Sequence, residues 1–242
     1  MNSTDTMPVG RTARNRASRF LSRTGWLSTL TNRCRTLVLS RCRPVCFAAG
    51  QTIYTQGDTP DGLFGFVDGG IKVLRAGEDG ALVQLHLTEA GFWTGETALF
   101  HGQTRFFTLV ATQPTLGLHL SQDDLTDLLH CNPDRVPEIY SLSHRNQATT
   151  LRLMAHLMTP NYERRIALRL LHYDDMSQDP DRWIKLGQED LARLLSVSMP
   201  TLHRTLRSFK RTGLVELGYG RLRVRDRSAL LATCAKDRDP AA

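Results

Sequence analysis

The stretch Gln188–Arg211, QEDLARLLSVSMPTLHRTLRSFKR, predicts two short helices separated by a tight turn. In its first half, Leu191, Leu194 and Leu195 recur at three- and four-residue spacing. Residues with that spacing share one face of an amphipathic helix, so these leucines are expected to be buried. The charged residues of this half lie on the other faces.

The second helix is predicted to begin after Ser198, which is a natural N-cap residue. Pro200 falls in its first turn, where a missing N–H costs no hydrogen bond. The apolar stripe of this helix consists of Leu202, Leu206 and Phe209, again at helical spacing. This half therefore has its own buried face.

The opposite face of the second helix is polar or cationic. At 100° per residue, Arg204, Arg207 and Arg211 project from it together with Pro200. Two helices joined by so short a turn are typical of the helix-turn-helix, whose second helix enters the major groove of DNA. Charge spacing alone fits a solvated helical hairpin equally well.

The residues that follow favour DNA binding. Two alternating runs, 214–216 and 221–225, flank Gly218-Tyr219-Gly220, a pattern typical of a small β-hairpin. Helix, turn, helix and hairpin in this order predict a winged-helix DNA-binding domain.

The run QEDLARLLSVSMPTLHRTLRSFKRTGLVEL, residues 188–217, resembles the DNA-binding end of the bacterial catabolite-activator and fumarate-nitrate regulator (Crp/Fnr) family. The resemblance extends upstream to about Trp26. In that family the first turn of the recognition helix reads bases through three side chains, and the matching positions are Met199, Pro200 and Arg204. Arg204 is expected to carry most direct readout through guanine, while Arg207 and Arg211 are expected to meet phosphate. The predicted DNA-binding residues are Ser198, Met199, Pro200, Thr201, His203, Arg204, Arg207 and Arg211.

The length of 242 residues allows two domains, each with its own core. Residues 1–46 hold nine Arg against one Asp, and residues 160–242 hold sixteen basic against eleven acidic residues. A basic end suits phosphate neutralisation.

No run of 18 apolar residues predicts a membrane span, and the first 22 residues lack the apolar segment of a secretory signal, so we expect a cytoplasmic protein. We predict a basic flexible arm (1–24), a β-roll effector domain (25–132), a dimerisation helix (133–160) and a winged helix-turn-helix domain (161–242).

From Val45 onward, short strands with glycine at their corners predict an antiparallel roll. GQTIYTQGD (50–58) and the later segment 95–100 resemble the jelly-roll cyclic-nucleotide-binding domain of the same family, which implies an α+β fold for the whole chain. The family pattern holds ribose with a Gly-Glu pair and the cyclic phosphate with an Arg. Those residues are matched here by Gly95, Glu96 and Arg105.

Two positions of the family pocket differ. Phe106 stands where the pattern has a hydroxyl residue, and Leu151 replaces a hydroxyl-bearing neighbour of Thr150 on the next helix. Because a lost hydrogen bond to a charged group costs about 1 kcal/mol or more, we expect weak or absent cyclic nucleotide binding. Alternatively, Glu96 and Arg105 form an ion pair in a vestigial pocket, with Phe106 and Phe107 in the core. The expected effector-pocket residues are Gly95, Glu96, Arg105, Phe106, Thr150 and Leu151.

A long helix is predicted to begin at Pro137 and to run to Met158, with apolar residues at both ends and polar residues between Ser143 and Thr150. The resemblance implies that this is a dimer helix, that the homodimer binds a pseudo-palindromic site in double-stranded DNA, and that RNA polymerase is a further partner.

Five cysteines raise the question of a metal or redox centre, since fumarate-nitrate regulators hold an iron–sulfur cluster. Cys34, Cys42 and Cys46 contain no C-x2-C pair, so a cluster is not predicted, although Cys42 and Cys46 could form a redox switch. No catalytic or metal-binding motif occurs, so we expect no enzyme and no metal site. Two further alternatives are an effector-independent regulator with a purely structural roll and a cyclic-nucleotide module that controls a partner protein.

Overall fold

The computed structural model describes residues 10–235, except for the side chains of residues 100 and 101. The chain divides into two compact units, Met1–Ala148 and Thr149–Ala242, with the division inside the long helix α5 (Val136–Leu157). Within the described range, no helix combines the length and apolar character needed to cross a membrane.

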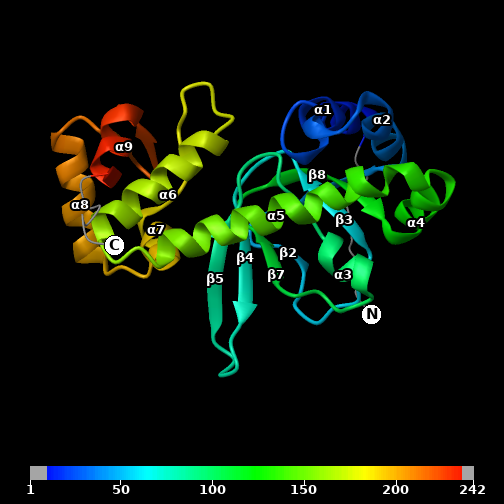
Figure 1. Ribbon diagram of the computed structural model, residues 1–242, viewed down its shortest axis with the longest axis horizontal. Helices are drawn as coiled ribbons and strands as arrows, with labels where there is room; N and C mark the ends of the chain where they lie inside the picture. Colours follow the sequence, from blue (N-terminus) through cyan, green and yellow to red (C-terminus); the bar gives the residue numbers. More distant parts are fainter. Residues whose placement is uncertain (1–9, 236–242) are drawn as a thin grey trace. The chain divides into compact units, whose positions relative to one another are not determined.

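The first unit contains two antiparallel sheets of four strands each, which confirms the predicted roll (Figure 1). Figure 1 also shows that the hairpin of the fourth and fifth strands extends beyond the other strands. The first sheet has the order β1 (Arg43–Phe47), β8 (Thr115–Ser121), β3 (Gly62–Phe66) and β6 (Trp93–Thr94), and the second has the order β2 (Thr52–Tyr54), β7 (Thr108–Ala111), β4 (Ile71–Ala76) and β5 (Leu82–Leu87).

Alternation along the strands of the first sheet produces two hydrophobic cores. Phe64 and Phe66 belong to the core shared by the two sheets. Leu63, Leu118 and Leu120 point to the other face, where they pack with residues from helices. The helices and turns of this unit before α5 are α1 (Arg11–Leu21), η1 (Trp26–Thr29), α2 (Asn32–Arg41), α3 (Glu96–His101), α4 (Gln122–Cys131) and η2 (Pro133–Arg135).

The prediction of a flexible arm over residues 1–24 is wrong for residues 11–21, which form α1. Ala17 and Leu21 on this helix are fully buried, and Ala13 and Phe20 pack against the same core. These four apolar residues recur at helical spacing and form one buried stripe. Arginines stand between them, and the charge of these arginines led to the prediction of a flexible arm. Residues 1–9 of the predicted arm lie outside the described range.

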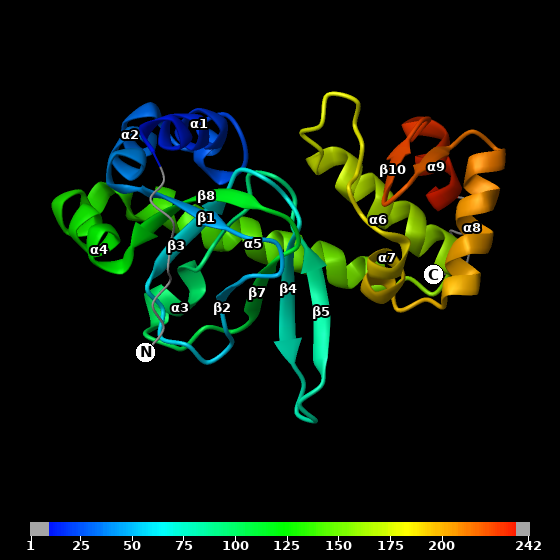
Figure 2. The same ribbon diagram turned by 180° about the vertical axis from the view of Figure 1, so that it is seen from behind.

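Two short helical elements, η1 and α2, follow α1 before the first strand. Leu30 has extended backbone dihedrals, and the Thr31 side chain caps α2 by accepting a hydrogen bond from the Cys34 N–H at 3.3 Å. Figure 2 shows α1 and α2 lying beside each other, and Arg14 donates from Nη2 to the Ser40 carbonyl at 3.1 Å.

Helix α5 begins at Val136, one residue before the predicted start, so Pro137 lies in its first turn. Part of its apolar seam is buried within the chain, because Ile139 and Leu142 belong to the core of the first unit. Other apolar side chains of this region are exposed, namely Val136, Tyr140, Leu151, Met154, Leu157 and Met158.

The second unit has the predicted order of helix, turn, helix and hairpin. Its leucine stripes are buried as expected, including Leu191 and Leu195 of α7 and Leu202 and Leu206 of α8. The elements are α6 (Tyr162–Met176), α7 (Gln188–Leu195), α8 (Met199–Arg211), β9 (Val215–Gly218), β10 (Arg221–Val224) and α9 (Arg227–Ala235).

Candidate DNA-binding face and effector pocket

The turn between α7 and α8 is fixed by local hydrogen bonds. Ser196 adopts a left-handed conformation with φ 50°, and the Val197 N–H donates to the Ala192 carbonyl at 3.1 Å. The Ser198 hydroxyl accepts from the Thr201 N–H at 3.3 Å, which confirms it as the N-cap of α8. These contacts fix where the exposed face of α8 begins.

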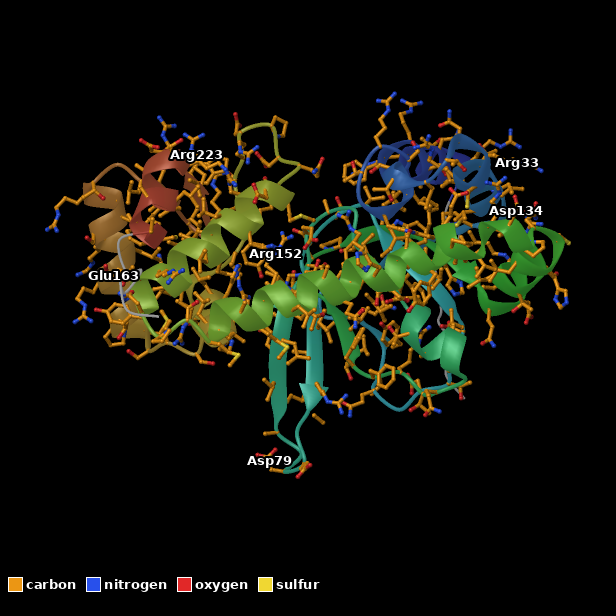
Figure 3. The ribbon with its side chains drawn as sticks, viewed as in Figure 1. Arg33, Asp79, Asp134, Arg152, Glu163 and Arg223 are labelled. Carbon is orange, nitrogen blue, oxygen red and sulfur yellow. The ribbon has the colours of Figure 1, made fainter. Side chains whose placement is uncertain are left out.

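The outer face of α8 contains a hollow of about 650 Å³. Five of the predicted DNA-binding residues line it together with Ser208 and Glu163, which lies at the start of α6 (Figure 3). The predicted residues that line the hollow are Pro200, His203, Arg204, Arg207 and Arg211.

The other three predicted DNA-binding residues lie at the amino end of α8. The hydroxyls of Ser198 and Thr201 are 2.9 Å apart and take part in capping, and Met199 is half-buried. The arginines and this amino end thus belong to one helix, as a reading face requires.

Arg204 has a partner that sequence reasoning missed. Its Nη2 donates to the Tyr162 hydroxyl at 3.0 Å, and its guanidinium carbon lies 5.6 Å from the centre of the Tyr162 ring. Tyr162 is the first residue of α6, so this contact joins α6 to α8.

The hairpin of β9 and β10 packs on Trp183. The guanidinium carbons of Arg221 and Arg223 lie 4.2 and 4.6 Å from the centre of its ring. Arg223, labelled in Figure 3, also forms an ion pair with Glu216 at 2.8 Å. Tyr219 at the tip of the hairpin is fully exposed. The wing is therefore anchored at its base by Trp183, a residue that no sequence pattern had marked.

In the first unit, Arg105, the residue expected to bind an effector phosphate, is only 2% exposed. Its Nη2 donates to Asp61 Oδ1 at 2.6 Å and to the Gly62 carbonyl at 2.9 Å, and its Nη1 donates to the Gly95 carbonyl at 3.3 Å. The guanidinium carbon lies 4.2 Å from the centre of the Tyr54 ring. The site therefore holds a buried cation between oxygen acceptors and an aromatic ring.

Glu96 begins α3 beside this guanidinium and is 3% exposed. Its Oε1 accepts from Asn146 Nδ2 and from the Thr97 hydroxyl, each at 3.1 Å. Burial raises the pKa of the Glu96 carboxyl, and the hydrogen bond from Asn146 opposes that rise.

Gly95 lets these groups approach one another. It has φ 110°, and a Cβ placed on it would lie 2.5 Å from the Gly62 carbonyl oxygen and 2.7 Å from Arg105 Nη1. A larger residue would push the guanidinium from its place, so glycine is required by both conformation and space.

The structure brings together three of the six predicted pocket residues, Gly95, Glu96 and Arg105. The hypothesis of a Glu96–Arg105 ion pair is wrong, because the carboxylate that pairs with Arg105 among the described residues is that of Asp61. A carboxylate on the loop before β3 reaches the guanidinium more directly than Glu96, which is held by Asn146.

The other three predicted residues lie differently. Phe106 is 41% exposed and so is not a core residue, whereas Phe107 packs against the core between the sheets, with its ring centre 6.0 Å from that of Tyr54. Thr150 and Leu151 are exposed positions of α5 in the second unit. Their part in a pocket remains a prediction.

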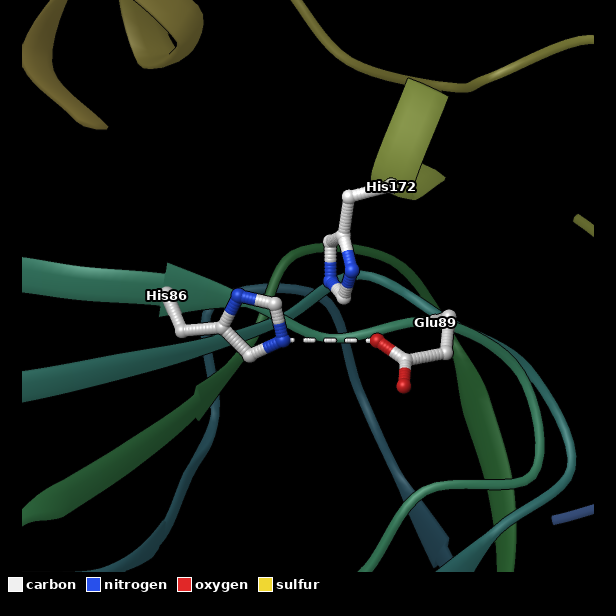
Figure 4. A group of neighbouring side chains, drawn as sticks. All are labelled: His86, Glu89 and His172. Atoms are coloured by element: carbon white, nitrogen blue, oxygen red, sulfur yellow. Dashed lines mark hydrogen bonds and ion pairs between the residues drawn. The ribbon is translucent and has the colours of Figure 1, made fainter. Parts of the chain in front are cut away.

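His86 and Glu89 form a second buried polar contact in the first unit. His86 Nε2 lies 3.3 Å from Glu89 Oε2 across the end of β5 (Figure 4), and the side chains are 8% and 10% exposed. The pair links β5 to the segment that leads from β5 to β6.

The N-terminal cysteines do not have the character of reactive thiols. Burial raises the pKa of Cys34 to about 11 and that of Cys42 to about 12, and it also raises the pKa of Cys46. Because the thiolate is the nucleophile in thiol oxidation and disulfide exchange, such pKa values oppose redox switching.

Comparisons with known proteins agree with both halves of the structure. The family model of the cyclic nucleotide-binding domain matches residues 44–132, and that of the Crp-like helix-turn-helix domain matches residues 164–233. The cAMP-activated global transcriptional regulator CRP of Salmonella typhimurium is 25% identical over 182 residues, which cover 73% of this chain and 87% of that protein. The Cyclic AMP receptor protein of Thermus thermophilus is 26% identical over 194 residues, covering 80% and 89%.

Solved structures share the fold. FixK2 of Bradyrhizobium japonicum matches with a TM-score of 0.70 at 15% identity, covering 79% of this chain and 96% of that one. The c-di-GMP responsive global regulator CLP of Xanthomonas campestris matches with a TM-score of 0.60 at 18% identity, covering 81% and 100%. The roll matches the cyclic nucleotide-binding domain, and the Crp-like helix-turn-helix domain follows it in the sequence. This chain therefore belongs to the Crp/Fnr family of transcription regulators.

Proposed function

We propose that this regulator binds a pseudo-palindromic operator as a homodimer and responds to an effector in the pocket of its first unit. The observation that carries the proposal is the arginine-lined outer face of α8, where Arg204, Arg207 and Arg211 border one hollow. Arginine is suited both to guanine edges and to phosphate. Double-stranded DNA is the partner that fits this surface.

Dimerisation is supported by the exposed apolar side chains of α5. Tyr140, Leu151, Met154 and Leu157 are between 37% and 60% exposed, which is unusual for four apolar residues on one helix. A second copy of α5 is the partner we propose, since a two-fold dimer presents two recognition helices to two half-sites. RNA polymerase is proposed as the further protein partner, and the cytoplasm, where bacterial DNA lies, as the site of action.

A non-enzymatic role accords with the family. A regulator that needs no effector is the second candidate. That candidate is favoured by the Asp61 carboxylate, which already neutralises Arg105 at 2.6 Å. The thiol pKa values speak against the redox alternative. The spacing of Cys34, Cys42 and Cys46, which contains no C-x2-C pair, speaks against the iron–sulfur alternative.

Genomic footprinting separates the two candidates. Bound sites would be mapped with purified protein in the presence and in the absence of extracted cell metabolites. The proposal expects occupancy that changes with the metabolites, and equal occupancy in both samples would select the effector-independent regulator. A protein that protects no discrete sites would contradict both.

A further inference from the structure

Two functional groups of the pocket are already bound by side chains of the chain itself. Arg105, the residue proposed to take an effector's phosphate, donates to Asp61 at 2.6 Å. Glu96, proposed to take a ribose hydroxyl, accepts from Asn146 at 3.1 Å. Each partner has the chemistry of the ligand group that it would replace, an anion in one case and a hydrogen-bond donor in the other.

We propose that Asp61 and Asn146 are internal ligands that set the selectivity of this pocket. A cyclic nucleotide binds only if its phosphate displaces Asp61 from Arg105 and its ribose displaces Asn146 from Glu96. The inference rests on the proposed effector pocket and adds to it the residues that decide which ligands enter.

Asp61 competes with an incoming phosphate through its charge. Arg105 is 2% exposed and lies against the Tyr54 ring, so its charge is poorly solvated and pairs strongly with an anion. With Asp61 in place the pair is neutral, and an incoming phosphate meets a carboxylate as well as a guanidinium. The Asp61 side chain is 52% exposed, so it can leave for water when a stronger anion arrives.

Asn146 competes with an incoming ribose through its hydrogen bond to Glu96. Its Nδ2 donates to the Trp93 carbonyl at 3.0 Å and to Glu96 Oε1 at 3.1 Å, which holds the amide over the carboxylate. A ribose hydroxyl would donate to the same carboxylate. Asn146 therefore competes with the sugar for one acceptor.

The pocket nevertheless keeps two polar atoms unused. Within the described part of the chain, Arg105 Nε and Glu96 Oε2 are buried without a hydrogen-bond partner. Buried polar atoms are nearly always paired. Arg105 Nε is therefore a free donor and Glu96 Oε2 a free acceptor. Both can form hydrogen bonds with a ligand once Asp61 and Asn146 have been displaced.

Calorimetric titration of the full chain with cyclic AMP and with cyclic GMP tests the inference. The variants are Asp61→Asn, which keeps size and removes charge, and Asn146→Ala. Asp123→Asn on α4 and Gln147→Ala on α5 are matched controls at exposed positions. Each pocket variant should bind at least one of the nucleotides about tenfold more tightly than the unmodified chain, as expected for one hydrogen bond to a charged group. Adding Arg105→Ala should abolish the gain.

The inference is overturned if neither nucleotide binds the pocket variants more tightly than it binds the unmodified chain, or if the controls show the same gain. Submicromolar binding by the unmodified chain would also overturn it. Thermal unfolding confirms that each variant is folded, and Asp61→Ser replaces Asp61→Asn if that variant is not. DNA binding is measured separately by fluorescence anisotropy, so a protein that fails to bind DNA refutes the proposed function without deciding this question.

Discussion

The Arg204 guanidinium donates to the Tyr162 hydroxyl at 3.0 Å, which ties the residue proposed to read bases on α8 to the first residue of α6. Arg204 remains exposed, and guanidinium N–H groups besides the one bonded to Tyr162 remain for DNA. Tyr162 thereby restricts the directions in which Arg204 can point. We infer that it positions Arg204 for one base pair.

Tyr162→Phe should therefore weaken the base preference at the Arg204 position by about 1 kcal/mol, the usual contribution of one such hydrogen bond. The measurement is a titration of the preferred operator and of its single-base variants. Tyr219→Phe at the wing tip is the matched control, because Tyr219 is fully exposed. If Tyr162→Phe discriminates among the operators as well as the unmodified chain does, the contact has no role in reading.

Leu151→Glu should prevent dimer formation. The side chain is 60% exposed on α5, and a carboxylate there would have to be buried against a second copy at a cost of several kcal/mol. Light scattering at micromolar concentration should report a dimer for the unmodified chain and a monomer for the variant. Ala232→Glu, at an exposed position of α9, is the control for added charge alone. A variant that stays dimeric would show that α5 pairs through another face.

Stability should fall in mild acid because of His156. Burial, reinforced by Arg169 and Arg152, lowers the pKa of this imidazole from 6.5 to about 4. Below pH 6.5 the unfolded chain takes up a proton that the folded chain refuses until about pH 4, so folding stability declines through this window. The loss should reach on the order of 2 kcal/mol at pH 5. Urea unfolding at pH 7.5 and at pH 5 measures it.

The control for this effect is a comparison of His156→Gln with His144→Gln. His144 is an exposed position of the same helix, so its replacement should leave the pH dependence unchanged. Replacement of His156 should flatten the pH dependence. If folding stability declines equally in the unmodified chain and in both variants, the pH dependence comes from groups other than His156.

The N-terminal thiols should be unreactive while the protein is folded. Burial raises the pKa of Cys34 to about 11 and of Cys42 to about 12, whereas Cys131 is exposed. A thiol-reactive aromatic disulfide should label Cys131 rapidly and the other two only after unfolding. Peroxide should leave operator binding unchanged. A peroxide-sensitive protein that Cys42→Ser makes resistant would restore the redox alternative.

Sequence patterns predicted those parts of the molecule in which neighbouring residues carry the signal. The apolar stripes of α7 and α8 and the glycine-bounded wing follow from the spacing of residues within the segment 188–224, and the structure confirms them. Helix α1 was not predicted, because arginines stand between its four apolar core residues and their charge favoured the prediction of a flexible arm.

Only part of the pocket could be predicted from the sequence. Gly95, Glu96 and Arg105 lie close together in the sequence and match the family pattern. Their actual partners are distant, since Asp61 precedes Arg105 by 44 residues and Asn146 follows Glu96 by 50. Nothing local marks such pairs, because each depends on how the roll brings strands and α5 together.

Selection of binding sites from a random DNA pool tests the central claim, sequence-specific reading of DNA by a dimer. The unmodified chain should enrich a pseudo-palindrome whose half-sites are centred about 34 Å apart. Arg204→Ala should relax one base pair in each half-site, at a cost of about 1–3 kcal/mol in discrimination. Arg211→Ala should weaken all sequences alike and reduce the salt slope by about 0.9. Enrichment of no sequence, or of one lacking two-fold symmetry, would contradict the account.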